Sequence, residues 1–200
     1  LKSAQVFDYV NHSENYGIKI SKSSVDFDSI ISRSRGVADG MSKGVNFLMK
    51  KNKIDILNGF GKNISKNEVE VTTEENKKEI HKSDDIIIAT GGRSRELPNL
   101  KIDNEKVIEY RKAMTLEKQP KKMVVVGSGA IGSEFAYFYN SIGTEVILVE
   151  YLPNILPLED IDVSKQLEKS FKKAGVNIMT NTEVLSVDTK GKGCKVKYKS

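Results

Sequence analysis

Three glycines with a defined spacing are the residues of this sequence best suited to hold a ligand. Gly127, Gly129 and Gly132 give the pattern G-x-G-x-x-G directly after a run of three valines. Glycines at this spacing allow a tight turn, a close approach of a pyrophosphate to the backbone, and close packing of the next helix on the strand. The free N–H groups at the start of that helix favour the negative charge of phosphates. The pattern therefore predicts a dinucleotide-binding turn.

Glu150 supplies the second chemical signal, because it ends the next apolar run after the glycines. A carboxylate at this place accepts hydrogen bonds from the adenosine ribose hydroxyls and repels a 2′-phosphate. No arginine occurs in the following residues 151–160. We therefore expect NAD rather than NADP. The alternative interpretation is a glycine-rich turn of an α/β protein that binds no ligand.

The elements that would position these residues alternate regularly after residue 119. We expect strands at 121–127, 144–150 and 176–180, helices at 130–142 and 163–175, and a hairpin of residues 182–188 and 194–198. In the first of these helices, the apolar residues expected to face the sheet are Ile131, Phe135, Phe138 and Ile142. Parallel strands joined by helices predict a Rossmann-like α/β domain.

Residues 1–118 follow a different pattern. We expect helices near 1–10, 28–51 and 108–114, and strands at 54–63, 67–73, 78–84 and 84–92. The last of these strands runs into Thr90, Gly91 and Gly92, where backbone N–H groups can approach a flat ligand without obstruction by side chains. An ordinary turn is the alternative. The change of pattern predicts a domain boundary near residue 118.

Composition narrows the range of functions. Only five of the 32 basic residues are arginines, and the lysines are scattered among acids, so we expect no nucleic-acid partner. No apolar run is long enough to cross a membrane. Cys194, His12 and His81 lie outside any metal-ligand or catalytic spacing, so we expect no metal site and no catalytic residue among these 200 residues. Because the sequence begins with Leu1 rather than Met, we expect either a chain from which a presequence has been removed or a fragment of a longer protein.

The order of the two glycine motifs resembles that of the flavoprotein disulfide oxidoreductases with two dinucleotide-binding folds (class I pyridine nucleotide-disulfide oxidoreductases). Residues 44–71, 86–98 and 123–150 carry the resemblance and are most similar to dihydrolipoamide dehydrogenases. It implies the C-terminal part of an FAD-binding domain at 1–118, with an antiparallel β section, and an incomplete NAD-binding domain at 119–200.

The resemblance also implies roles for individual residues. Gly61 would contact FAD on its adenine side, and Thr90, Gly91 and Gly92 would form the second FAD motif. The NAD loop and helix start would be Gly127, Ser128, Gly129, Ala130, Ile131, Gly132, Ser133 and Glu134, with Glu150 on the ribose and Val184 near the adenine. Two positions depart from the family pattern: Gly92 replaces a frequent serine, and Ser133 stands where an aliphatic residue is common.

The activity implied by the resemblance is oxidation of dihydrolipoamide, a protein-bound lipoyl group, with NAD⁺ through FAD and a redox-active disulfide. The cysteine pair and the histidine base would lie outside this segment. The implied partners are the lipoyl domain of a 2-oxo acid dehydrogenase complex or of the glycine cleavage system, and a second copy in a homodimer. A role in cell redox homeostasis, and a place in a mitochondrion, a plastid or the bacterial cytoplasm, would follow. Two alternatives remain: a related FAD- and NAD(P)H-dependent disulfide reductase or NADH-oxidising flavoprotein, and a non-catalytic NAD-binding module.

Overall fold

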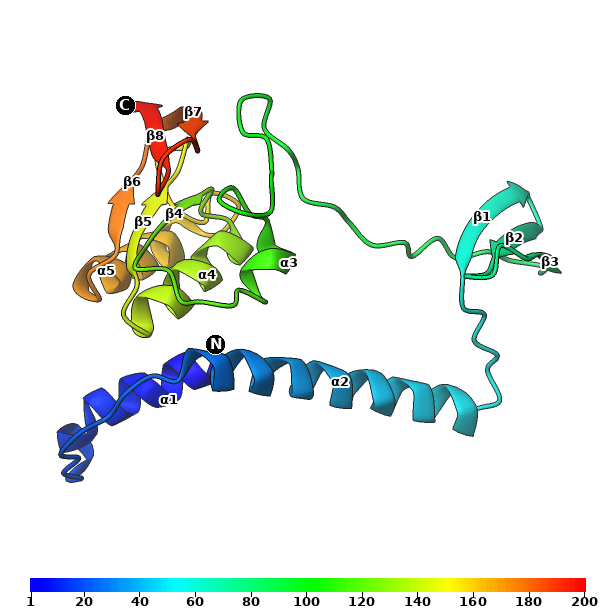
Figure 1. Cartoon of the computed structure of the whole chain (residues 1–200), viewed down its shortest axis with the longest axis horizontal. Helices are drawn as coiled ribbons and strands as arrows, with labels where there is room; N and C mark the ends of the chain where they lie inside the picture. The colour runs from blue at the N-terminus through cyan, green and yellow to red at the C-terminus, as the bar shows by residue number, and fades with distance from the viewer. The chain divides into compact units, whose positions relative to one another are not determined.

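The computed structural model describes residues 1–200, which divide into two compact units. The large unit comprises residues 1–33 and 94–200, and the small unit comprises residues 34–93. Each unit combines helix with strand, as the ribbon in Figure 1 shows. The predicted mixed α/β class is therefore confirmed. The domain boundary expected near residue 118 stays a prediction.

A three-stranded parallel sheet forms the centre of the large unit. Its strands, in the order β4-β5-β6, are β4 (Lys122–Val126), β5 (Glu145–Val149) and β6 (Asn177–Met179). Parallel neighbours need a crossover connection, and these are supplied by helices α4 (Ala130–Ser141) and α5 (Ile161–Lys173). Both helices lie beside the sheet in Figure 1. The predicted strand–helix alternation is confirmed, with bounds that differ by one or two residues.

The stripe predicted for α4 is buried except at its first residue: Ile142 is 4% exposed, and Phe135 and Phe138 pack against the buried core. Ile131 is 53% exposed, whereas Ala136 and Tyr139 are fully buried. The reason is Gly132, one position further along, whose missing Cβ would lie 3.4 Å from Val125 Cγ1 of β4. The buried stripe therefore runs through residues 132, 136 and 139, which share one helix face. The prediction for Ile131 was wrong because a glycine, which carries no apolar signal, makes the first contact with the strand.

Tyr139 joins the sheet to the segments that precede it. Its hydroxyl donates to the carbonyl oxygen of Ala113 at 2.6 Å, at the end of the short helix α3 (Tyr110–Ala113). Burial raises the pKa of Tyr139 to about 12, so the hydroxyl keeps its proton and remains a donor. Ala4 of α1 (Lys2–Asn11) and Phe27 belong to the same buried cluster. The 3₁₀ helix η1 (Ser13–Tyr16) follows α1.

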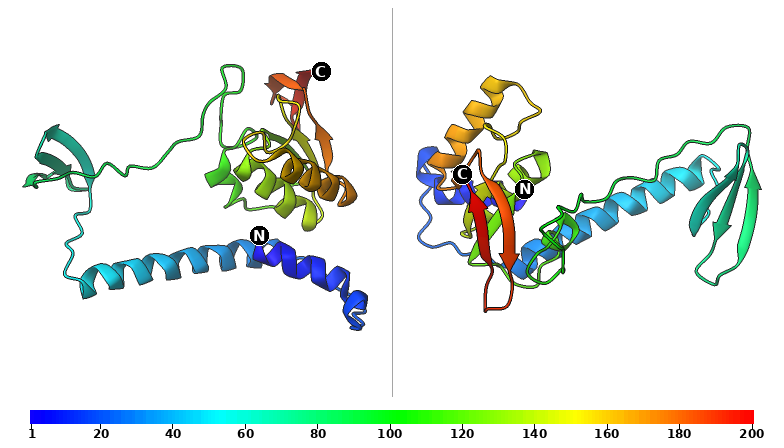
Figure 2. Two further views of the ribbon diagram at one scale, coloured as in Figure 1. Left: turned by 180° about the vertical axis from the view of Figure 1, so that it is seen from behind. Right: turned by 90° about the horizontal axis from the view of Figure 1, so that it is seen from above.

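The predicted hairpin near the end of the chain is confirmed as β7 (Glu183–Asp188) paired with β8 (Lys195–Lys199), and the right view of Figure 2 shows the two strands side by side. Lys106 Nζ donates to the carbonyl oxygens of Thr189 and Gly191 in the connecting turn. The hairpin is thereby attached to a loop that lies before the parallel sheet in the sequence.

The small unit holds most of α2 (Phe27–Lys51) and an antiparallel sheet in the order β1-β2-β3. The three strands are β1 (Phe60–Ser65), β2 (Glu68–Thr72) and β3 (Lys78–Lys82). Residues 84–92 form no strand, so that prediction was wrong. A strand requires a neighbouring backbone as hydrogen-bond partner, and none pairs with this segment. Ile87 is accordingly 91% exposed and Ile88 73% exposed.

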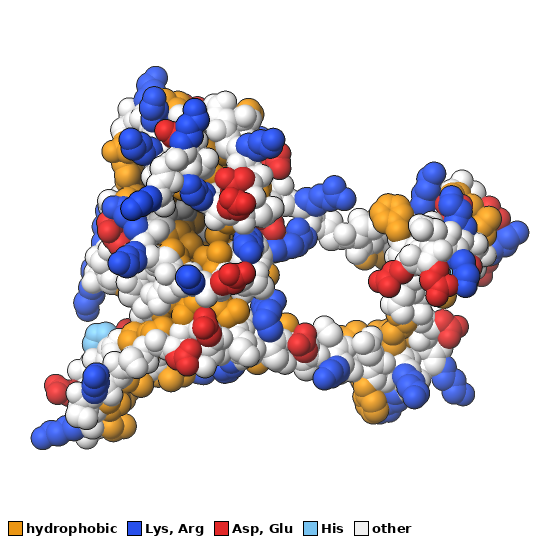
Figure 3. Space-filling view, viewed as in Figure 1, with side chains coloured by type: hydrophobic (Ala, Val, Ile, Leu, Met, Phe, Trp, Pro, Cys, Tyr) orange, Lys and Arg blue, Asp and Glu red, His pale blue; other side chains and the backbone are white.

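On the face shown in Figure 3, Lys and Arg side chains lie on both units with Asp and Glu side chains among them. No helix combines the length and the apolar character that spanning a membrane requires.

Candidate dinucleotide site

The chain turns sharply where β4 ends. Gly127 has a φ of 94°, a conformation that residues with a side chain rarely adopt, and its N–H donates to the carbonyl oxygen of Val149 at 2.8 Å. The bond holds the turn against the end of the neighbouring strand β5. The carboxyl ends of the two parallel strands and the beginning of α4 therefore meet at one place, as expected for ligand sites in open α/β sheets.

The two other glycines of the motif have different surroundings. A Cβ on Gly132 would lie 2.0 Å from the carbonyl oxygen of Gly127, so only glycine permits this contact between helix and turn. A Cβ on Gly129 would meet nothing within 4 Å. Gly132 is therefore required by the fold, whereas the space beside Gly129 is open to a ligand.

The N-terminus of α4 is suited to an anion. Gly129 is its N-cap residue and provides no side-chain hydrogen bond, and no acidic side chain lies in the first turn. The first N–H groups of a helix lack partners within the helix and carry partial positive charge. The open space and the uncapped N–H groups together fit the pyrophosphate of a dinucleotide.

Glu150 lies directly against this turn. Its Oε2 accepts hydrogen bonds from the N–H of Ser128 at 2.8 Å and from Ser128 Oγ at 2.6 Å, and its Oε1 accepts one from the N–H of Leu152 at 2.9 Å. The side chain is only 6% exposed. Burial raises the pKa of the Glu150 carboxyl, but the hydrogen bonds from Leu152, Ser128 and the backbone of Tyr151 together outweigh burial and lower this pKa. A fixed, ionised carboxylate therefore stands beside the glycine turn.

A second layer of hydrogen bonds holds Ser128 in place. Its carbonyl oxygen accepts from Ser133 Oγ at 2.9 Å and from the N–H of Leu156 at 3.0 Å. The hydroxyl of the buried Ser133 therefore stabilises the glycine turn. The resemblance implies an aliphatic residue at this position. The loop after Glu150 is attached to the turn through Leu152 and Leu156.

Some of these contacts were missed by sequence reasoning. Leu152 and Leu156 act only through backbone N–H groups, so their residue type gives no signal. Ser128 was predicted only as a member of the loop, and nothing in the spacing indicates that its hydroxyl reaches Glu150. Only the fold brings these groups together.

The remaining candidates of the large unit lie close to the turn in the sequence or in the sheet. Ala130, Ile131 and Glu134 are exposed on the first turns of α4. Val184 belongs to β7, which starts next to Thr182, and the N–H of Thr182 donates to the carbonyl oxygen of Glu150 at 2.9 Å. The strand that bears Val184 therefore begins beside the backbone of Glu150.

The four candidates for FAD binding lie in the small unit. Gly61 is in β1, and a Cβ there would be 3.7 Å from Val69 Cγ1, which is an ordinary contact. Thr90, Gly91 and Gly92 are exposed and outside helix and strand, and Gly91 has a φ of 75°. Space for a ligand exists beside Gly91 and Gly92, since a Cβ on either would meet nothing within 4 Å. Their contact with FAD stays a prediction.

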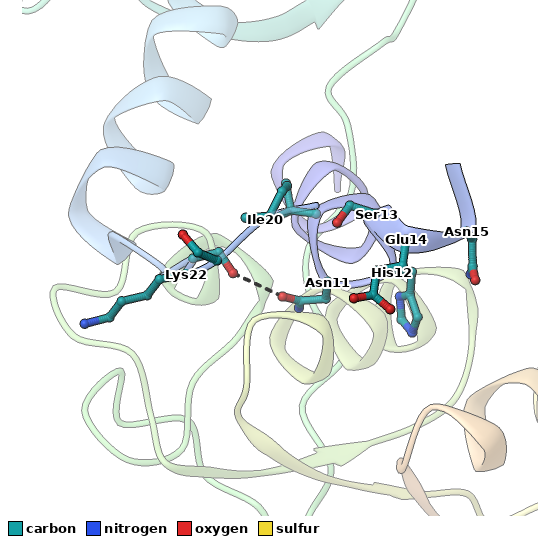
Figure 4. A pocket seen from close by; sticks show the side chains of 10 residues that line it. Asn11, His12, Ser13, Glu14, Asn15, Ile20 and Lys22 are labelled. Carbon is teal, nitrogen blue, oxygen red and sulfur yellow. Dashed lines mark hydrogen bonds between the residues drawn. The ribbon is translucent and has the colours of Figure 1, made fainter. Parts of the chain in front are cut away.

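A cavity of about 330 Å³ lies elsewhere, at the end of α1. Its walls are residues 10–15 and 20–23, and Figure 4 shows Asn11, His12 and Glu14 among them. Ser23 Oγ donates to Asn11 Oδ1 across it at 3.3 Å. No residue of the predicted dinucleotide site lines this cavity.

The sequence pattern of the pyridine nucleotide-disulphide oxidoreductases matches residues 6–200. The chain belongs to this family. Among the members of this family that it resembles, the dihydrolipoyl dehydrogenase of Zymomonas mobilis is 42% identical over 193 residues, which are 96% of this chain and 41% of the relative. The mitochondrial dihydrolipoyl dehydrogenase of Pisum sativum is 35% identical over 98% of this chain and 39% of its own length.

A solved structure confirms the fold of the chain. The crystal structure of LpdA from Mycobacterium tuberculosis matches with a TM-score of 0.89 and 26% identity, over 98% of this chain and 43% of that protein. The chain therefore spans about two fifths of the length of the relatives it matches.

Proposed function

We propose that the complete protein is a flavoprotein that oxidises dihydrolipoamide, as a protein-bound lipoyl group, with NAD⁺. The observation that carries the proposal is the buried Glu150 carboxylate, which is fixed by Ser128 against a glycine turn with open space at Gly129. Relatives named dihydrolipoyl dehydrogenase support the choice of substrate. The redox-active disulfide and the histidine base would come from residues outside this chain.

The contribution of this chain is to bind and orient the two cofactors. NAD would place its pyrophosphate before the N–H groups that begin α4, between Gly127 and Glu134, with a ribose hydroxyl on Glu150 and the adenine near Val184. FAD would lie against Gly61 and the segment from Thr90 to Gly92. Bound FAD supplies the two-electron chemistry that links thiols to the nicotinamide. Residues 1–118 would belong to the FAD-binding domain and residues 119–200 to the NAD-binding domain.

The partner would be the lipoyl domain of a 2-oxo acid dehydrogenase complex or of the glycine cleavage system, and the protein would act as a homodimer. The relatives are a bacterial protein and a mitochondrial one. We therefore propose the bacterial cytoplasm or an organelle of the mitochondrial or plastid type as its location.

Two glycine variants of the complete protein test the nucleotide site. Gly129→Ala adds a methyl group where the protein leaves open space, so we expect the fold to stay stable while the affinity for NAD⁺ falls about tenfold or more. Gly132→Ala forces a methyl group against the carbonyl of Gly127, so we expect a loss of about 2 kcal/mol of stability. Isothermal titration with NAD⁺ and urea unfolding measure the two effects. Equal loss of stability in both variants would contradict the assignment of the open space to a ligand.

Activity measurements test the rest of the proposal. The purified protein should be yellow and should reduce NAD⁺ with dihydrolipoamide much faster than it reduces NADP⁺. A yellow protein that binds NAD⁺ but leaves dihydrolipoamide unoxidised would be a related disulfide reductase or an NADH-oxidising flavoprotein. A colourless protein that binds NAD⁺ would be a non-catalytic NAD-binding module.

A further inference from the structure

We infer that Ser128 is a positioning residue that determines the preference for NAD over NADP, because its hydroxyl and N–H fix one oxygen of Glu150 and leave the other to the ribose. The inference rests on the proposed function. It gives a role in nucleotide preference to a side chain that cannot contact the ligand directly. Ser128 has no exposed surface. Its hydroxyl can therefore act on a bound nucleotide only through Glu150.

The two oxygens of Glu150 have different donors. Oε2 accepts both donors of Ser128, whereas the N–H of Leu152 donates to Oε1 and the backbone of Tyr151 also donates to this carboxylate. A carboxylate has about four lone-pair sites, two on each oxygen, so Ser128 by itself saturates Oε2. A ribose hydroxyl would therefore be accepted by Oε1, the oxygen that Ser128 does not occupy.

Ser128 is itself held firmly enough to impose this orientation. Its carbonyl oxygen accepts bonds from Ser133 Oγ in α4 and from the N–H of Leu156 in the following loop. The carbonyl oxygen of Ser128 is therefore held by α4 and the following loop. Its N–H and its hydroxyl both donate to Glu150 in the absence of a ligand. A ligand that binds to a carboxylate already held in place causes a smaller loss of conformational entropy than one that binds to a mobile carboxylate.

The same arrangement opposes a 2′-phosphate. A buried carboxylate that cannot rotate away presents its charge at a fixed place in a medium of lower dielectric than water, where repulsion between like charges is strong. Without the Ser128 hydroxyl, Glu150 would lose a charge-assisted hydrogen bond and could swing aside. The binding of NAD⁺ should then weaken, and the exclusion of NADP⁺ should relax. Discrimination is the ratio of the two affinities, so both changes lower it.

Ser128→Ala in the complete, oxidised, flavin-bound protein tests the inference. The probes are NAD⁺ and NADP⁺, which do not reduce the flavin, and the readout is isothermal titration. We expect the NAD⁺ affinity to fall about three- to tenfold, because a Glu150 side chain freed from Ser128 must be ordered when the nucleotide binds, and the NAD⁺/NADP⁺ affinity ratio to fall at least as much. An unchanged ratio would overturn the inference, whether both affinities fall together or neither changes.

The matched control is Ser164→Ala. Ser164 is also a buried serine, and its hydroxyl donates to the carbonyl oxygen of Ile155 in the same loop, without contact to Glu150. We expect it to lose stability but to keep the affinity ratio of the wild type. Should Ser128→Ala fail to fold, Ser128→Cys keeps the shape of the side chain, with a larger atom that is a much weaker donor, and must still lower the ratio. Failure of the wild-type protein to bind NAD⁺ would contradict the proposed function itself. If the Ser128 variants instead have the same NAD⁺/NADP⁺ affinity ratio as the wild type, only the role of this serine is contradicted.

Discussion

The two units of the chain bury their apolar residues to very different extents. In the large unit, Ala136, Tyr139 and Leu148 have no exposed surface. In the small unit, Val71 is the one buried apolar residue, while Met41, Phe47 and Ile87 are mostly exposed. Both units have well-formed helices and strands. Regular secondary structure therefore does not by itself indicate a complete core.

The difference comes from what each element has as a neighbour. Helix α4 packs on strands β4 and β5, and α5 packs on β6, so these helices bury apolar side chains against the sheet. The apolar stripe of α2 beyond Ser34 is largely exposed, and so are Ile87 and Ile88. Because burial supplies most of the stabilising free energy, the candidate NAD site lies in the unit with the larger buried core.

Hydrogen exchange should show the largest contrast between the units. The amides of Ile147 and Leu148 lie in β5, which pairs with strands on both sides, whereas Ile87 and Ile88 belong to no strand. We expect the first pair to exchange at least about a thousandfold more slowly in the 200-residue chain. Exchange followed by mass spectrometry measures the rates. Equally slow exchange at 86–88 would show that this segment pairs with another strand. The two units would then not differ in this respect.

Truncation of one apolar side chain in each unit should give the next largest effect. Leu148→Ala opens a cavity in the core of the parallel sheet and should cost about 3 kcal/mol. Ile87→Ala removes atoms that are already in water and should change the free energy of unfolding by less than about 0.5 kcal/mol. Urea unfolding followed by circular dichroism compares the two. A loss at Ile87 that matched the loss at Leu148 would mean that the small unit buries this residue after all.

The smallest effect on stability is expected from Glu150, the acid of the candidate site. The pKa of Glu150 is lowered from the usual value of 4.5, because the hydrogen bonds from Leu152, Ser128 and the backbone of Tyr151 outweigh the opposing effect of burial. A lowered pKa stabilises the folded state above the unfolded-state pKa, and this stabilisation is lost as the pH falls through the folded-state pKa. We therefore expect the urea midpoint of the wild type to fall below about pH 4.5, and to fall less in Glu150→Gln.

Asp103 serves as an internal reference in that experiment. The amides of Glu105, Val107 and Lys106 lower the pKa of its carboxyl in the wild type and in the variant alike. The difference between the two pH profiles therefore isolates Glu150. Identical profiles would mean that the hydrogen bonds of this carboxylate add nothing to folding.

The sequence predicted the large unit well, because its signals are local. The valines of β4, the glycine spacing and the acid after β5 each depend on neighbours a few residues away, and all three lie where expected. The strand at 84–92 was predicted from an equally apolar run, but a strand depends on a distant partner that local composition does not reveal. The link between Ser128 and Glu150 escaped prediction for the same reason.

The hydrogen bonds that hold Glu150 limit redesign of the nucleotide preference. Replacing this acid with an apolar or basic residue, which has no acceptor atom, would leave three donors, two on Ser128 and one on Leu152, without their acceptor inside the protein. Orphaned buried donors are costly. A change of preference to NADP⁺ would therefore require exchange of the whole 150–156 loop together with Ser128. A single substitution would lower the stability of the protein without creating the new preference.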